Sequence, residues 1–172
     1  MENAEKLVNL LIEKKLHITT AESCTGGMVA SRIVDVANAS KVFNVAYVTY
    51  ANEAKEKYLN VDSKTIEKYG VVSEEVTKQM ALGALKEANA DISIVTSGIA
   101  GPTGGTEYKP VGMVCFGVGI KDNVYTSTKY FGNIGRNKVR SMATEYIIDF
   151  AINFFKKSKK RLVKINWIWY YK

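Results

Sequence analysis

The chain has 172 residues, 47% of them hydrophobic and 24% charged, a balance typical of one globular domain with a buried core. Its formal net charge is +7, but residues 156–172 contain seven Lys and Arg side chains and no acidic one, so the remaining 155 residues are electrically balanced. The total charge therefore does not indicate a nucleic-acid-binding body. Two cysteines and one histidine argue against a disulfide framework and a zinc site, and a reducing, cytoplasmic location is expected.

The predicted elements alternate between helices and strands through most of the chain. Helices are assigned from helical apolar spacing, and strands from runs of β-branched and aromatic residues. In chain order they are helix 4–15, strand 17–22, helix 26–40, strand 42–50, helices 52–61, 63–70 and 73–90, strand 91–97, strands 111–120 and 124–131, and helix 136–157. This order predicts an α/β fold: a three-layer α/β/α sandwich with a mixed, mainly parallel sheet and one late antiparallel hairpin.

Two of these segments carry more specific expectations. Strand 42–50 is rich in β-branched and aromatic residues, so we expect it to be buried. Helix 26–40 is expected to turn one apolar side toward the core. That side comprises Met28, Val29, Ile33, Val34 and Val36.

Polar and glycine-rich loops follow three of the predicted strands. The first loop contains Ser23, the second contains Tyr50, Asn52 and Lys55, and the third is the segment 97–105. Sites in open α/β sheets form at the carboxyl ends of strands. If the three strands are parallel neighbours, these loops share one edge of the sheet.

Ser23, in the segment AESCTGG, is a candidate nucleophile where a predicted strand turns into a helix. A serine needs a base, but His17 lies six residues earlier on the same predicted strand, roughly 20 Å away at strand spacing. A lysine is the remaining common base, and position at the sheet edge favours Lys55 and, second, Lys109. Two plainer interpretations stay open: Ser23 caps the following helix, and Lys55 is a solvated surface residue. Cys24 is expected to be a small buried residue.

Glycines in two of the loops suit anion binding. Glycine lets backbone N–H groups turn inward toward a phosphate or an oxyanion, and a helix start adds the attraction of its dipole. These glycines are Gly98, Gly101, Gly104 and Gly105 in the third loop, and Gly26 and Gly27 at a predicted helix start. Neither GxxxxGK[ST] nor GxGxxG is present, so the glycines alone are weak evidence.

Four segments, taken in order, resemble the CinA C-terminal domain family: AESCTGG, VTYANEAKEKYLNV, GVVSEEVTKQMA and GIAGPTGGTEYKPVGMV. The resemblance runs from the first predicted helix to about residue 155. It implies a three-layer α/β/α sandwich and the activity of the family's amidases, which hydrolyse the carboxamide of nicotinamide mononucleotide to nicotinic acid mononucleotide and ammonia. It implies no metal and no other cofactor.

The resemblance also implies roles for particular residues. The family's nucleophile falls on Ser23 and its lysine base on Lys55, while its late arginine falls on Arg136, with Arg140 as the second arginine. Backbone N–H groups near Thr25 and Gly26 are expected at the oxyanion, and Arg136 with the glycine loop at the phosphate. The substrate-binding candidates are Tyr50, Thr25, Gly26, Gly27, Asn52, Gly101, Gly104, Gly105 and Arg136. Tyr50 as a core aromatic and Arg136 as a helix-surface residue remain alternatives.

Further expectations concern the ends of the chain and its partners. Many family members carry a larger preceding domain, so this length favours a stand-alone amidase, with residues 1–155 as the amidase domain and 156–172 as a basic and aromatic tail. The tail, which holds Trp167 and Trp169, is expected to dock on the body or another subunit, or to stay mobile. A small-molecule nucleotide and a homo-oligomer are the expected partners. The competing functions are a non-catalytic nucleotide-binding module and a competence protein that binds nucleic acid through the tail.

Overall fold

Five strands form one sheet in a computed structural model that describes the backbone of residues 2–166 and the side chains of residues 2–156. The strands are β1 (Ile18–Glu22), β2 (Phe43–Val48), β3 (Ile92–Gly98), β4 (Met113–Ile120) and β5 (Asn123–Tyr130). Their order across the sheet is β2-β1-β3-β4-β5. β1 pairs in parallel with β2 and β3, whereas β4 pairs antiparallel with β3 and β5. The predicted mixed sheet and late antiparallel hairpin are therefore confirmed.

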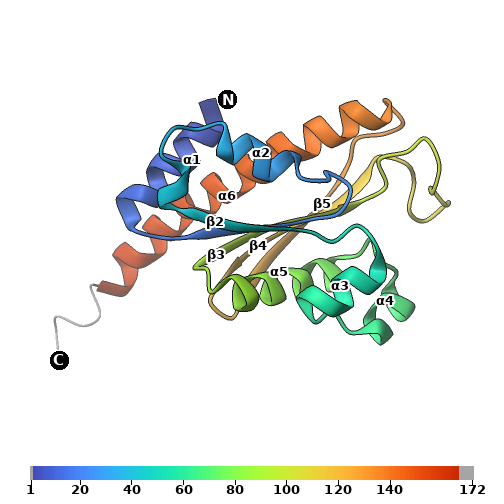
Figure 1. Ribbon diagram of the computed structural model, residues 1–172, viewed down its shortest axis with the longest axis horizontal. Helices are drawn as coiled ribbons and strands as arrows, with labels where there is room; N and C mark the ends of the chain where they lie inside the picture. The colour runs from blue at the N-terminus through green and yellow to red at the C-terminus, as the bar shows by residue number, and fades with distance from the viewer. Residues whose placement is uncertain (1, 167–172) are drawn as a thin grey trace.

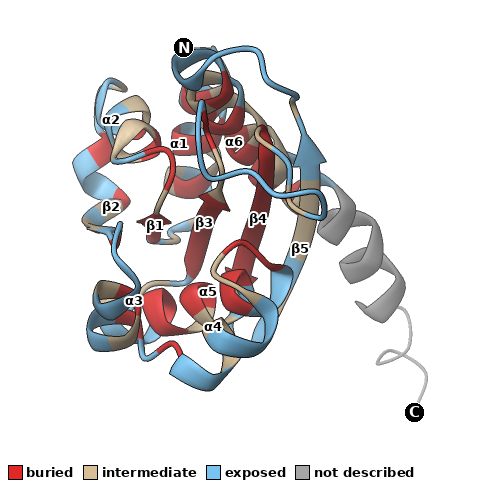
Figure 2. Cartoon of the chain, turned by 90° about the vertical axis from the view of Figure 1, so that its right-hand side faces the viewer, coloured by how far each residue is buried: buried red, intermediate tan, exposed pale blue. Residues whose placement is uncertain are grey.

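Helices cover both faces of this sheet. They are α1 (Glu2–Lys14), α2 (Met28–Val34), α3 (Asn52–Leu59), α4 (Ser63–Tyr69), α5 (Glu74–Ala88) and α6 (Arg136–Asn166), with a short 3₁₀ helix, η1, at Ala39–Lys41. α1, α2 and α6 lie on one face and α3, α4 and α5 on the other (Figure 1; Figure 2). This arrangement confirms the three-layer α/β/α sandwich. Within residues 2–166, none of the helices has the length and apolar character needed to cross a bilayer.

The core is divided by the sheet into two main clusters. On the face of α1, α2 and α6, Leu7 and Ile147 pack with Ile94 of β3, and all three are buried. On the other face, Leu59 of α3 and Met80 of α5 pack over the sheet. Figure 2 shows β3 and β4 buried along most of their lengths. Apolar burial on both faces of the central strands is what a three-layer fold requires.

A glycine permits the close packing of α5 against α3. A Cβ atom at Gly83 of α5 would lie 1.9 Å from the carbonyl oxygen of Leu59, at the end of α3. No side chain fits at that separation. Gly83 therefore sets how deeply α3 sits on α5.

Three of the predicted elements differ from the structure. The helix predicted for 26–40 ends at Val34, and Asn38 has a left-handed φ of 67° before η1. Val34 is 62% exposed, so the expected apolar side of this helix is only partly right. The strand predicted for 42–50 spans Phe43–Val48 at the edge of the sheet and is half-buried rather than buried. Edge position leaves one side of β2 unpaired, which local sequence does not reveal.

The last helix is longer than the sequence predicts. We expect it to end at residue 157, whereas the backbone of α6 is helical to Asn166. The expectations for Trp167 and Trp169 lie outside the described residues.

Candidate active site

Ser23 and Lys55 come together at the carboxyl edge of the three parallel strands. Ser23 directly follows β1, and its N–H donates to the carbonyl oxygen of Thr96 in β3 over 3.0 Å. Lys55 lies in the first turn of α3, and its Nζ is 3.3 Å from Ser23 Oγ. The loops after β1 and β2 therefore share one edge, as the predicted parallel order requires.

The Lys55 amine is enclosed by oxygen atoms. Its side chain is fully buried, with 0% exposed, and its Nζ donates to the carbonyl oxygens of Thr49 over 2.7 Å and Tyr50 over 3.2 Å. A protonated amine has three hydrogens to donate, and a neutral one has two and a lone pair. In the neutral form the two N–H groups can satisfy these carbonyls while the lone pair faces the Ser23 hydroxyl.

Burial lowers the pKa of Lys55 from 10.5 to about 8. Desolvation of the ammonium group is the main cause, and the negative charge of the Glu53 carboxylate opposes it. At this pKa about a tenth of the amine is neutral at pH 7, which suits a general base. Its complete burial contradicts the interpretation of Lys55 as a solvated helix residue.

A buried carboxylate that sequence analysis missed caps α2. Glu22, the last residue of β1, is fully buried and accepts hydrogen bonds from the N–H groups of Gly27 (2.9 Å) and Ala30 (2.8 Å). The Thr25 hydroxyl donates to the same carboxylate over 2.7 Å. Glu22 therefore satisfies the helix start that Ser23 was expected to cap in the plainer interpretation. Its position beside Ser23, at the end of a strand, was the available signal.

Two arginines on α6 reach the loops at this edge. Arg136 donates to the carbonyl oxygen of Gly101 over 2.9 Å and to the Tyr50 hydroxyl over 3.0 Å. Tyr50 is 62% exposed, which contradicts its alternative as a core aromatic. Arg140, one turn along, donates to two backbone carbonyls of the turn that follows Ser23. α6 thus connects the glycine loop with the loops after β1 and β2.

A cavity of about 280 Å³ opens beside Ser23. Its walls come from the loops after β1, β2 and β3, from the segment before α5 and from Arg136. The lining residues are Ser23, Cys24, Tyr50, Asn52, Val71, Val72, Ser97, Gly98, Ile99, Ala100, Gly101, Thr103, Gly104 and Arg136. Among the described residues, the N–H groups of Ala100, Gly101 and Gly104 donate to no other protein group. These donors and the Arg136 guanidinium suit an anionic ligand.

Comparison with known proteins identifies the family. The model of the CinA C-terminal domain matches residues 1–155. The chain belongs to the CinA C-terminal domain family. A relative from Clostridium beijerinckii, whose name includes the words competence-damage inducible protein, is 54% identical over 143 residues, which cover 83% of this chain and 35% of the relative. A CinA-like protein from Kosmotoga olearia is 49% identical over 147 residues, covering 86% of this chain and 35% of its own length.

Solved structures of CinA proteins share the fold of this chain. A CinA superfamily protein from Escherichia coli is 36% identical, with a TM-score of 0.85 and coverage of 88% of each chain. A competence or damage-inducible protein from Enterobacter asburiae is 34% identical, with a TM-score of 0.85, and covers 88% of this chain and 95% of its own. The chain spans about a third of the length of the curated CinA relatives that it matches.

Five of the predicted binding residues of this CinA domain line the cavity and four do not. Tyr50, Asn52, Gly101, Gly104 and Arg136 line it, whereas Thr25, Gly26, Gly27 and Gly105 lie outside its lining.

Backbone donors at the start of α2 are already engaged. The N–H of Gly26 donates to Ser23 O over 3.1 Å, and that of Gly27 donates to Glu22. This helix start therefore binds the domain's own Glu22 carboxylate, and the N–H groups of Gly26 and Gly27 are not free to bind a substrate anion.

Three other candidates in the CinA domain are unsuited to accept the Ser23 proton: Cys24, His17 and Lys109. Burial raises the pKa of the Cys24 thiol to about 12, so this residue stays a thiol at neutral pH. His17 precedes β1, and its backbone N–H donates to the Asp91 carboxylate over 2.8 Å. Lys109 donates to the carbonyl oxygen of Tyr69 and is absent from the cavity lining. Lys55 is therefore the lysine that the fold brings to Ser23.

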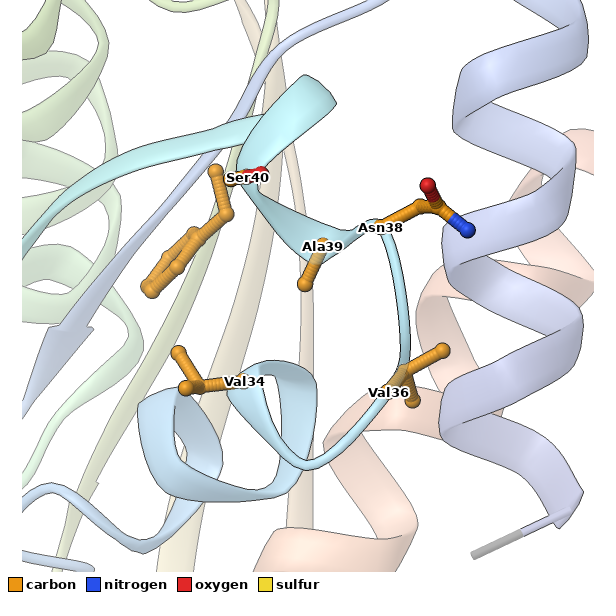
Figure 3. Close-up of a pocket in the computed structure, with 6 residues that line it drawn as sticks. Val34, Val36, Asn38, Ala39 and Ser40 are labelled. Atoms are coloured by element: carbon orange, nitrogen blue, oxygen red, sulfur yellow. The ribbon is translucent and has the colours of Figure 1, made fainter.

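A second cavity of the CinA domain lies at the other end of β2 and has a different character. It measures about 320 Å³ and is enclosed by the end of α2, by η1 and by the start of β2 (Figure 3). Its lining residues are Val34, Val36, Asn38, Ala39, Ser40 and Phe43, none of which is an acid, a base or a thiol. In the described part of the chain, no three His, Cys, Asp or Glu side chains gather as a metal site.

Proposed function

We propose that the chain is an amidohydrolase that converts nicotinamide mononucleotide to nicotinic acid mononucleotide and ammonia. The observation that carries the proposal is the contact between the buried Lys55 amine and the Ser23 hydroxyl, 3.3 Å apart at the wall of a cavity. Membership of the CinA family, some of whose members are amidases, supports the choice of reaction. The proposal concerns this domain alone, because the domain matches only about a third of the length of the curated relatives.

The first half of the reaction forms an acyl-enzyme. Neutral Lys55 accepts the proton of the Ser23 hydroxyl as Oγ bonds to the carboxamide carbon. The carbonyl oxygen becomes an oxyanion, and its negative charge needs hydrogen-bond donors. When this intermediate collapses, the C–N bond breaks and the leaving nitrogen takes the proton from the Lys55 ammonium. Ammonia departs, and an ester remains on Ser23.

The second half releases the acid. Lys55 accepts a proton from water as the water oxygen attacks the ester carbon. The bond to Ser23 Oγ then breaks, and Oγ recovers the proton from Lys55. The cavity is suited to hold the mononucleotide phosphate. Arg136 and the N–H groups of the glycine loop that donate to no other protein group are the kinds of donor that bind an anion.

The test measures ammonia and nicotinic acid mononucleotide after incubation of the purified protein with nicotinamide mononucleotide, with and without a chelator. We expect turnover in both conditions, and a loss of roughly 10³-fold or more in Ser23→Ala and Lys55→Met. Lys57→Met, an exposed lysine on the same helix, is the matched control and should keep its activity. Ligand-induced thermal stabilisation of the parent protein without turnover would instead establish a non-catalytic nucleotide-binding module.

A further inference from the structure

We infer that Arg140 is a positioning residue that orients the backbone N–H of Cys24 toward the oxyanion. The inference rests on the proposed function, because it assigns a role at the same site. It goes beyond the roles of Ser23 and Lys55, because the hydrogen bonds of Arg140 go to the carbonyl oxygens of Cys24 and Thr25.

Arg140 donates two hydrogen bonds to the turn that follows the nucleophile. Its Nε donates to the carbonyl oxygen of Cys24 over 3.1 Å, and its Nη2 donates to that of Thr25 over 2.8 Å. The guanidinium also lies close over Gly26, where an added Cβ atom would be 3.3 Å from Nη2. Two donors in a rigid, planar group fix both the position and the rotation of the carbonyls that they hold.

Because peptide units are rigid planes, these hydrogen bonds also affect the orientation of the residue next to Ser23. The Thr25 carbonyl and the Gly26 N–H belong to one peptide unit, so Arg140 orients both of them. That N–H donates to the carbonyl oxygen of Ser23 over 3.1 Å. The Ser23 carbonyl in turn shares a peptide unit with the Cys24 N–H, which must point in the opposite direction. Cys24 lines the cavity, and its N–H, which follows the nucleophile directly in the chain, donates to no backbone carbonyl of the described residues.

The other side of the turn is held independently. The Thr25 hydroxyl donates to the buried carboxylate of Glu22 over 2.7 Å and is 2.7 Å from the Thr96 hydroxyl. The Ser23 N–H donates to Thr96 O. With these anchors in place, loss of Arg140 releases the two peptide units without releasing the ends of the turn. The effect should therefore fall on transition-state stabilisation rather than on folding.

Arg136 provides a contrast one helical turn away. It lines the cavity and holds Gly101 and Tyr50, so its replacement should weaken substrate binding and raise KM. Arg140 is absent from the cavity lining. Its replacement should lower kcat and leave KM nearly unchanged, because an oxyanion donor acts in the transition state.

The experiment compares Arg140→Met, Arg140→Lys and the matched control Lys138→Met, an exposed residue of the same helix, by steady-state ammonia release. We expect Arg140→Met to lose about 10- to 100-fold in kcat with KM within about threefold. This loss is smaller than the roughly 10²- to 10³-fold that follows removal of an oxyanion donor, because the Cys24 N–H is misaligned but still present. The inflection of its pH profile should stay where it is in the parent protein, since Lys55 is untouched. Arg140→Lys keeps the charge but not the fork, so it should restore only part of kcat. Lys138→Met should match the parent.

A second readout separates this inference from the proposed function. An arylsulfonyl fluoride probe should sulfonylate Ser23 Oγ with release of fluoride, and mass spectrometry follows the rate without any nucleotide. The probe should react more slowly with Arg140→Met than with the parent, in proportion to the lowered kcat. If Arg140→Met matches the parent in both kcat and probe reaction, or if it raises KM alone, the inference is overturned. If the parent releases no ammonia, the proposed function fails, and the probe rates alone decide the role of Arg140.

Discussion

At the scale of single residues, the site depends on the protonation of one buried amine. Lys55 is among the largest fully buried side chains of the described residues, and carbonyl oxygens of the loop after β2 accept from its Nζ. Those carbonyls keep the amine hydrogen-bonded, but they do not replace the hydration that the ammonium loses. Burial therefore has two effects: it makes the base competent near neutral pH, and it costs the folded state stability.

The first prediction follows from that cost. The pKa of Lys55 is about 8 in the folded state, against an ordinary value of 10.5. Between these values the unfolded state binds more protons, so the unfolding free energy rises with pH. The penalty is complete below pH 8 and is relieved as the pH approaches 10.5. Lys55→Met has no such titration.

Urea unfolding of the parent protein and Lys55→Met at several pH values tests this prediction. The stability advantage of Lys55→Met should shrink by up to about 3 kcal/mol as the pH rises across that window. A constant difference between the two proteins from pH 7 to 10.5 would show that the folded state does not depress the pKa of Lys55.

At the scale of elements, the position of α3 decides whether the base reaches the nucleophile. Lys55 and Leu59 are the buried residues of this helix and lie one turn apart on the same face. Leu59 ends α3 against Gly83 of α5, where backbone meets backbone. The packing of two helices without a side chain between them thus fixes the height of Lys55 above the sheet.

The second prediction concerns that contact. Alanine is ordinarily better than glycine in a helix by about 1 kcal/mol, yet Gly83→Ala should destabilise the protein by about 3 kcal/mol, because the added methyl forces α3 and α5 apart. Its kcat should fall as well, since α3 carries Lys55. Urea unfolding and ammonia release measure both effects. The exposed α5 control Lys78→Ala should change neither, and a stabilised Gly83→Ala with full activity would contradict the account.

The sequence predicts most elements of this fold but not their neighbours. Periodicity and turn residues locate the helices and strands within a few positions, because those signals are local. The burial of strand 42–50 is predicted wrongly, since edge position depends on strand order. The helix predicted for 26–40 is too long, because apolar residues such as Val34 continue the periodicity beyond the point where Asn38 turns the backbone.

At the scale of the whole molecule, the sheet order assembles the site. Placing β1 between β2 and β3 brings the three loops to one edge of the sheet. Arg136 and Arg140 of α6, the last helix, then hold these loops through hydrogen bonds. Local sequence shows Lys55 only as one of several charged residues in a helix. Its closeness to Ser23 is predicted instead from sheet-edge position and from the family resemblance. Glu22 and Arg140 act through backbone groups. The place of Glu22 beside Ser23 at the end of a strand is the one local signal of these contacts, and nothing in the local sequence around Arg140 indicates its partners.

The most direct test of the central claim, that Lys55 is the base for Ser23, is the pH dependence of kcat/KM for ammonia release from nicotinamide mononucleotide. This ratio reports the free enzyme, and deprotonation of Lys55 should make it rise with pH and level off above an inflection near pH 8. Between pH 5 and 7 the ratio should increase about tenfold per pH unit. A profile that is flat from pH 6 to 9, or an inflection near pH 8 that persists in the residual activity of Lys55→Met, would contradict the account.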